Sequence, residues 1–146
     1  MAQINQLDPQ TAKDINEYGK AGRLHLGIDG SIAPLEVVKR IETYIKGVKS
    51  RGEPLDENTV IGLGVLLGEQ YVRAFLWHWG EVVRDGVEED SEINILSPNN
   101  AFAINPMRWI NIVLSSERGT NFLLSFNMTE AGHTAQGTPN EAMLIN

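Results

Sequence analysis

Apolar positions recur at helical spacing through the first half of the chain, most densely over residues 57–76. On a helical wheel they occupy all but one narrow stripe of that segment. A helix that is apolar around most of its circumference is buried, so we predict that 57–76 is the central helix of the domain. Glu69 and Arg73 lie on the remaining stripe, and their spacing of four residues predicts an ion pair along the helix.

Gly64 and Gly68 lie one turn apart inside this central helix. An interior glycine costs about 1 kcal/mol relative to alanine in a helix. We therefore expect both glycines to mark the close approach of another backbone, either from the preceding helix or from the sheet.

Two more helices are predicted before the central one. An aspartate followed by a proline begins a helix over residues 9–18, and Gly19 ends it. Residues 20–33 contain three glycines, which predict a loop. Apolar residues at three- and four-residue spacing predict the second helix over 34–50. Because the connector that follows is short, this helix should be an antiparallel neighbour of the central helix.

After the central helix the period of the pattern changes to two, which indicates strands. The predicted strands cover residues 77–84, 92–96, 101–105 and 120–127. Before the last of them, an asparagine followed by a proline begins a short helix over 106–116. Ile110, Ile112 and Leu114 also alternate as they would in a strand, so the two assignments compete for this segment.

Helices followed by a run of strands predict an α+β domain, with a small antiparallel sheet packed on the central helix. We expect this single domain to cover residues 1–128. Residues 129–146 are poor in large apolar side chains, which predicts a loosely ordered C-terminal tail unless Met143, Leu144 and Ile145 dock on the domain.

Three short motifs occupy the middle of the chain: Leu-Gly-x-x-x-Gly-Glu at 63–69, Trp-His-Trp at 77–79 and Phe-Ala-Ile-Asn-Pro-Met at 102–107. In this order they resemble an uncharacterised family of small bacterial domains, in which such a helix precedes a tryptophan-bearing strand and a later short helix. The resemblance covers residues 55–116 and implies a bacterial α+β domain. It implies no activity, and no catalytic residue is carried over from it.

The 146 residues include 12 Lys and Arg against 19 Asp and Glu, for a formal net charge of −7. Nucleic acids and anionic membranes are bound through clustered Lys and Arg, so neither is the expected partner. Six acidic residues and one basic residue lie between positions 81 and 92. Glu88, Glu89 and Asp90 in that stretch predict either a surface that attracts a basic protein partner or a solvated loop.

The sequence contains little that points to catalysis. The absence of cysteine excludes disulfides and thiolate ligands. The three histidines lack the spacing of a metal site, and neither Ser31 nor Ser125 has the context of an activated nucleophile. We therefore predict no catalytic residue, metal or cofactor. No secretion signal and no bilayer-spanning apolar run are found, so we expect the protein in the cytoplasm.

These features favour a non-enzymatic protein that acts through contact with a protein partner, as small acidic immunity proteins do. The alternative is a small-molecule-binding domain or minor enzyme with a cleft between the central helix and the strand that contains Trp77 and Trp79. The candidate contact residues are His78, Trp79, Arg108 and Trp109, together with Glu88, Glu89 and Asp90. The small-molecule hypothesis predicts that His78, Trp79, Arg108 and Trp109 converge on a cavity, whereas the partner hypothesis predicts that they lie on an open face.

The strand after the central helix also predicts an apolar outer face. If its tryptophans face the helices, then Leu76, His78 and Val82 lie on the opposite side. This strip predicts a partner surface or the seam of a homodimer.

Overall fold

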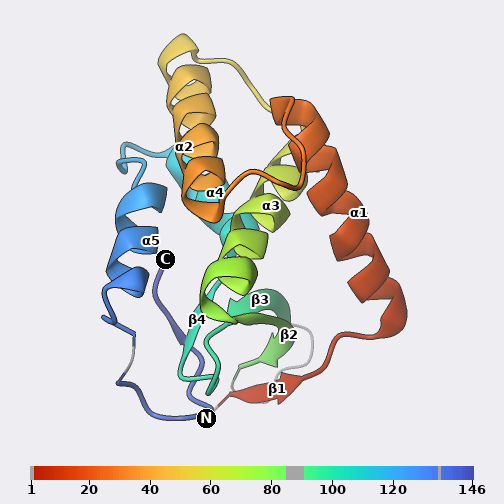
Figure 1. The fold of residues 1–146 in the computed structure, drawn as a ribbon, viewed down its shortest axis with the longest axis vertical. Coiled ribbons are helices and arrows are strands. Elements are labelled where there is room, and N and C mark those ends of the chain that lie inside the picture. The colour runs from red at the N-terminus through yellow and green to blue at the C-terminus, as the bar shows by residue number, and fades with distance from the viewer. Residues whose placement is uncertain (1, 85–90, 135) are drawn as a thin grey trace.

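The computed structural model describes residues 2–84, 91–134 and 136–146 (Figure 1). Within these residues the helices are α1 Pro9–Leu26, α2 Pro34–Arg51, α3 Glu57–Phe75, α4 Pro106–Ser115 and α5 Phe122–Glu130. The strands are β1 Gln3–Asn5, β2 His78–Val83, β3 Glu92–Leu96, β4 Phe102–Ile104 and β5 Met143–Leu144. The predicted α+β class is therefore confirmed. Figure 1 shows α3 in the middle, with α1 on one side, α2 and α5 on the other, and the sheet below.

The strands form one sheet in the order β1-β2-β3-β4-β5. Neighbours from β1 to β4 are antiparallel, whereas β5 runs parallel to β4, so the sheet is mixed and not purely antiparallel as predicted. Ile95 of β3 faces the helices and belongs to the main core. The next residue, Leu96, faces the other side, where it forms a small second core with Val82, Ala103 and Ala142.

Three helices begin at a residue whose side chain caps them. The side chains of Asp8, Asp56 and Asn105 each accept a hydrogen bond from the backbone N–H three residues later, at 2.7–3.0 Å. Hydrogen bonds from Thr11 lower the pKa of Asp8 below the ordinary value of an aspartate, and hydrogen bonds from Thr59 lower the pKa of Asp56 in the same way. Each aspartate cap therefore stabilises its helix fully above the ordinary pKa and loses that effect as the pH falls through the lowered one.

The middle of α3 is buried on every side, although Arg73 on its polar stripe is exposed and Glu69 is half-buried. All residues from 62 to 68 are buried, as are Gln70 and Tyr71. The stripe is covered by α1 as far as Glu69, because α1 continues through Gly19 to Leu26 and does not end at residue 18. Residues 20–26 are thus helix and not the predicted loop.

The glycines of α1 explain this error, because they are contact points and not terminators. Gly22 lies against Gly62 of α3 so closely that a Cβ atom on Gly22 would stand 2.5 Å from the Gly62 carbonyl oxygen. Gly27, with φ 68°, is the residue that ends the helix. A glycine that permits close packing and one that ends a helix look alike in the sequence.

The longer α1 also changes the ion pairing of α3. The carboxylate of Glu69 accepts hydrogen bonds at 2.7 and 3.0 Å from the guanidinium of Arg23, which lies on α1. Arg73 instead donates to the side-chain oxygen of Gln70 at 2.6 Å. The predicted pair between Glu69 and Arg73 is therefore wrong, since a better-placed cation comes from a segment read as loop.

Close approaches occur at both Gly64 and Gly68, but they differ from the prediction: Gly64 meets the backbone of α4 and not that of the preceding helix or the sheet, and Gly68 meets a side chain of the sheet and not a backbone. A Cβ atom on Gly64 would lie 2.8 Å from the backbone of Met107, at the start of α4. One on Gly68 would lie 2.5 Å from the ring of Trp79, on β2. Gly64 therefore admits α4, and Gly68 admits the Trp79 ring of β2 beside Pro106 of α4.

Residues 120–127, predicted as a strand, contain most of α5. Phe122 and Phe126 are buried four residues apart on one face of this helix, whereas Leu124 between them is exposed. The N–H of Leu123 donates to the carboxylate of Glu42 on α2 at 3.3 Å. This long-range cap and the packing of the two phenylalanines select the helix, although their spacing also satisfies an alternating pattern.

The last residues are attached to the sheet and do not form the predicted loose tail. The N–H groups of Met143 and Ile145 donate to carbonyls of Ala101 and Ala103 at 2.9 and 3.0 Å. Ala142 is fully buried in the second core. A small side chain suffices there because the sheet itself encloses it, so counting large apolar residues did not reveal the contact.

We expect Gly22→Ala to lower the free energy of unfolding by about 1–3 kcal/mol, the usual cost of overpacking, because neither backbone at this contact can yield. Gly47→Ala in α2 is the matched control. Its Cβ would meet only the flexible end of Arg51, at 3.0 Å, and alanine favours a helix by about 1 kcal/mol. Urea denaturation measures both variants. Equal stabilities would show that the contact between α1 and α3 is not tight.

Candidate functional site

The four described candidate residues do not converge on one cavity. His78 is exposed at the start of β2, while Trp79 is half-buried with its ring over Gly68. Arg108, on α4, forms an ion pair with Glu92 of β3. These residues thus lie in separate surroundings.

Trp109, the fourth candidate, is buried on α4 and stands edge-on to Phe122, with 4.8 Å between ring centroids. Glu88, Glu89 and Asp90 lie outside the described residues. Their role in attracting a basic partner therefore stays a prediction.

The predicted apolar outer face of β2 is partly covered. Val82 is fully buried beneath β1 and the end of the chain, packed by Ile4 and Leu144. Leu76 and His78 remain exposed. The strip that was predicted as a seam is therefore interrupted by the fold itself.

A cleft does lie between α3 and Trp79, as the small-molecule hypothesis predicts. Its volume is about 190 Å³, and α1 forms its other wall. Glu69 lines it but already accepts hydrogen bonds from Arg23. The cleft is thus small, and its carboxylate is engaged in joining two helices.

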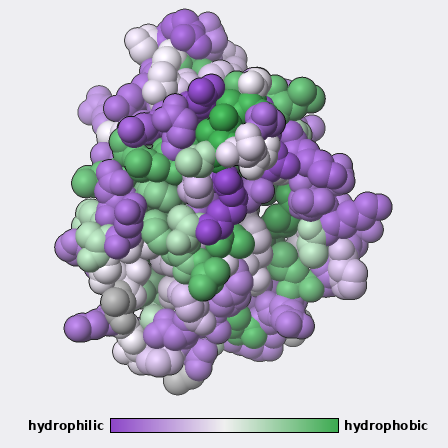
Figure 2. All heavy atoms as spheres, viewed as in Figure 1, coloured by the Kyte–Doolittle hydropathy of each residue, from purple (hydrophilic) through white to green (hydrophobic). Residues whose placement is uncertain are grey.

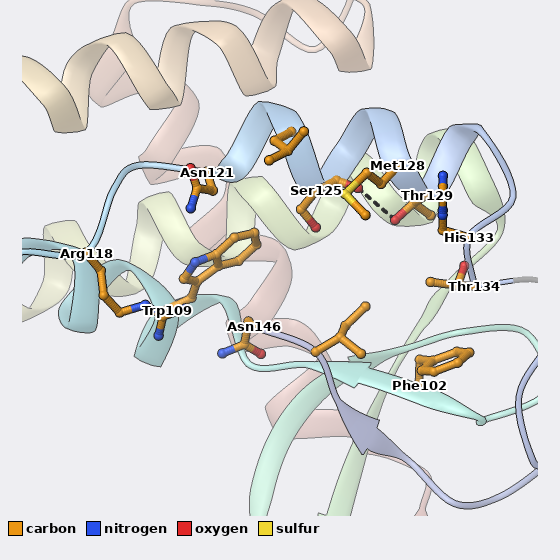
Figure 3. A pocket seen from close by; sticks show the side chains of 12 residues that line it. Phe102, Trp109, Arg118, Asn121, Ser125, Met128, Thr129, His133, Thr134 and Asn146 are labelled. Carbon is orange, nitrogen blue, oxygen red and sulfur yellow. Dashed lines mark hydrogen bonds between the residues drawn. The ribbon is translucent and has the colours of Figure 1, made fainter.

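A roomier pocket lies between α5 and the end of the chain, and we call it the α5 pocket (Figure 3). Its volume is about 320 Å³. Its lining consists of Phe102, Trp109, Arg118, Asn121, Leu124, Ser125, Met128, Thr129, His133, Thr134, Ile145 and Asn146. One of the predicted residues, Trp109, is therefore part of it.

The walls of the α5 pocket are mainly apolar. Phe102, Trp109, Leu124, Met128 and Ile145 supply large apolar side chains. Leu124 is 58 % exposed and Met128 44 % exposed. Figure 2 shows hydrophobic residues among polar ones on the side of the molecule that carries α5, as well as elsewhere on this face. Apolar surface is thus left in contact with water at the pocket.

Buried hydroxyls hold the floor of the pocket in place. The hydroxyls of Ser125 and Tyr71 hydrogen-bond at 2.9 Å, which joins α5 to α3. Thr129 donates to the carbonyl of Ser125 at 3.0 Å, the bond drawn in Figure 3. Burial raises the pKa of Tyr71 to about 12. Tyr71 therefore stays neutral at physiological pH and acts as a fixed support.

Polar groups occupy the two ends of the pocket. Figure 3 shows Arg118, Asn121 and Asn146 at one end, and His133 and Thr134 at the other. Among the described residues that line it, none is an aspartate or a glutamate. In a chain of net charge −7, such a lining offers hydrogen-bond donors without a carboxylate to engage them.

Two other hollows differ from the α5 pocket in their lining. One, of about 350 Å³, lies at the C-terminal end of α2 and includes Lys49 and Glu53. The other, of about 520 Å³, is bordered by Glu36, Lys39 and Arg40. The first hollow has a lysine and a glutamate among its lining residues, and half of the lining residues of the second are charged, so the α5 pocket is the better candidate for an apolar ligand.

Comparisons of this chain with protein-family models, curated proteins and solved structures find no match. Among the described residues, no three histidine or acidic side chains lie close enough together to hold a metal ion. None of the described helices is both long and apolar enough to cross a bilayer. The site must therefore be argued from its own geometry.

The sequence prediction missed nearly all of this pocket, because it assigned residues 120–127 to a strand and 129–146 to a tail. The spacing of Phe122 and Phe126 was the available signal, since side chains four residues apart share a helix face. The alternating pattern around Leu124 concealed it.

We expect one of the three tyrosines to ionise late in an alkaline titration. An unfolded chain releases the Tyr71 proton near pH 10, whereas the folded one holds it to about 12. The free energy of unfolding therefore falls as the pH rises between these two values. Tyrosinate absorbance measures the step, and Tyr71→Phe should remove it. A single common step for all tyrosines in the wild-type protein would contradict the burial of Tyr71.

Proposed function

We propose that this protein binds a small, largely apolar molecule in the α5 pocket. The observation that carries the proposal is an apolar-walled pocket of about 320 Å³ that combines exposed large apolar side chains with a rigid polar floor. Ligand sites in proteins typically measure roughly 300–1,000 Å³ and pair apolar walls with a few placed polar groups. The α5 pocket matches that description at its small end.

The volume limits the size of the ligand. At about 30 Å³ for each non-hydrogen atom, the share of one water in the liquid, the pocket accommodates roughly ten such atoms. A chain of eight carbons with its head group is of that size. Ligands of this size reach dissociation constants in about the micromolar to millimolar range.

Exposed apolar surface provides the driving force. Leu124 and Met128, one helical turn apart, contact water in the free protein. A ligand that covers them removes that surface from water, at about 25 cal/mol for each Å² of apolar area. The support from Tyr71 keeps α5 in place beforehand, so little ordering is needed on binding.

The geometry supports binding more than covalent chemistry. Ser125 is the candidate nucleophile in the pocket, but its hydroxyl is hydrogen-bonded to the Tyr71 hydroxyl and not to a general base. Contact with a protein partner through the acidic stretch stays a second proposal. Its central residues, Glu88, Glu89 and Asp90, are outside the described part of the chain.

Met128→Asp should weaken the binding of octanol about tenfold or more, because it replaces apolar wall with a charged group that the ligand would desolvate. Asn127→Asp adds the same carboxylate to the adjacent, exposed position of α5, which does not line the pocket. Chemical-shift titration of the Trp109 indole and α5 amide signals measures the affinity of each protein.

Asn127→Asp should bind octanol within about twofold of the wild-type affinity, since a remote exposed charge matters little for a neutral ligand. Equal losses in the two variants, or shifts confined to residues away from α5, would place the ligand elsewhere. If octanol produces no saturable shift in the wild-type protein, the α5 pocket is not a site for small apolar ligands.

A further inference from the structure

We infer that the ligand of the α5 pocket is a monocarboxylic acid, whose carboxylate is bound by Arg118, Asn121 and Asn146 while its apolar body lies toward Phe102 and Met128. This inference rests on the proposed function and names the ligand class. The inference is drawn from one end of the pocket, formed by the side chains of Arg118, Asn121 and Asn146, which we call the donor-rich end (Figure 3).

Asn146 presents a buried donor that the fold does not use. Its side-chain oxygen accepts a hydrogen bond from the N–H of Asn105 at 2.8 Å, which sets the orientation of the amide. The amide nitrogen is then buried without a partner among the described residues. Leaving a buried N–H group unpaired is costly, so an acceptor at this point would be strongly stabilised.

Arg118 is a second unused donor, on a loop that is held by its backbone. Lys49 donates to the carbonyl of Arg118 at 2.7 Å, and the N–H of Arg118 donates to the Ser116 hydroxyl at 3.3 Å. Within the described residues, the guanidinium itself has no hydrogen-bond or ion-pair partner. The backbone is therefore anchored while the charged group remains available.

Asn121 adds a third donor. It occupies the N-cap position of α5, yet its side chain makes no capping hydrogen bond. Asparagine at this position usually accepts from the first turn of its helix. Instead the N–H of Leu123 is taken by Glu42, so the amide of Asn121 is left free to line the pocket.

The charge of the donor-rich end selects a carboxylate over a phosphate. Among its lining side chains it holds one guanidinium, whereas His133 lies at the opposite end of the pocket (Figure 3). The nearby ammonium of Lys49 and carboxylate of Glu42 do not line the pocket and are hydrogen-bonded to the backbone of Arg118 and of Leu123.

One cation balances a monoanion, and the planar fork of arginine matches the two oxygens of a carboxylate. The amides of Asn121 and Asn146 can serve the remaining lone pairs. A doubly charged phosphate would be left half neutralised.

Octanoate and octanol test this inference, because they share a chain and differ in the head group. Wild-type protein should bind octanoate about tenfold more tightly or better, since hydrogen bonds to a charged acceptor are the strong ones. Arg118→Met should remove that preference and leave octanol within about twofold. Arg40→Met, which removes an exposed arginine from α2, is the control for net charge and should preserve the preference.

Asn146→Asp tests the site without relying on Arg118. Aspartate keeps the oxygen that accepts from Asn105 but replaces the buried donor with a negative charge. It should weaken octanoate at least tenfold and octanol little. Chemical-shift titration and a melting curve are recorded for every variant, so that a folding defect in Arg118→Met leaves Asn146→Asp to decide.

The outcomes separate the two proposals. Equal wild-type affinity for octanoate and octanol would overturn the carboxylate inference and leave the apolar site standing. The carboxylate inference would also be overturned if Arg40→Met abolished the octanoate preference as fully as Arg118→Met. The preference would then come from the overall charge of the protein and not from the pocket. Failure of both probes to bind would end the proposed function and the inference with it.

Discussion

The close packing around α3 is the constraint on which the rest of the structure depends. Three glycines of this helix admit its neighbours: Gly62 admits α1 on one face, whereas Gly64 admits α4 and Gly68 admits Trp79 of β2 on the opposite face. Each glycine lowers helix propensity, but together they allow residues 62–68 of the helix to be buried over the whole circumference. Because interiors are close-packed, the position of α3 then determines where the helices and the sheet can lie.

The α5 pocket follows from the same constraint. Tyr71 of α3 faces α5, and the hydrogen bond between the Tyr71 and Ser125 hydroxyls joins α5 to α3. β5 closes the other side, since its parallel pairing with β4 carries Asn146 to the start of α4. The pocket is therefore the space left between a helix held by α3 and a terminal strand held by the sheet. Among the described residues, the guanidinium of Arg118, the side chain of Asn121 and the amide nitrogen of Asn146 have no hydrogen-bond partner, because other bonds anchor the segments that contain them.

Much of the fold was predictable because its signals are local. Asp56 and Asn105 define helix starts through bonds to backbone groups three residues away, and Gly52 ends α2 in a left-handed conformation with φ 65°. Strands β2, β3 and β4 follow from alternation and turn residues within a few positions of themselves. The central role of α3 follows from its composition, since a helix that is apolar around most of its circumference is buried.

The remaining elements were decided by contacts between residues distant in sequence. Gly22 would end or weaken a helix by itself, but the backbone of Gly62 makes it a packing site. Residues 120–127 satisfy both helical and alternating patterns, and Glu42, about eighty positions earlier, selects the helix. The same holds for the α5 pocket: the sequence supplied Arg118, Asn121 and Asn146 as three unremarkable polar residues. Only the tertiary structure brings them to one end of an apolar pocket, because that proximity depends on chain segments that no local pattern relates.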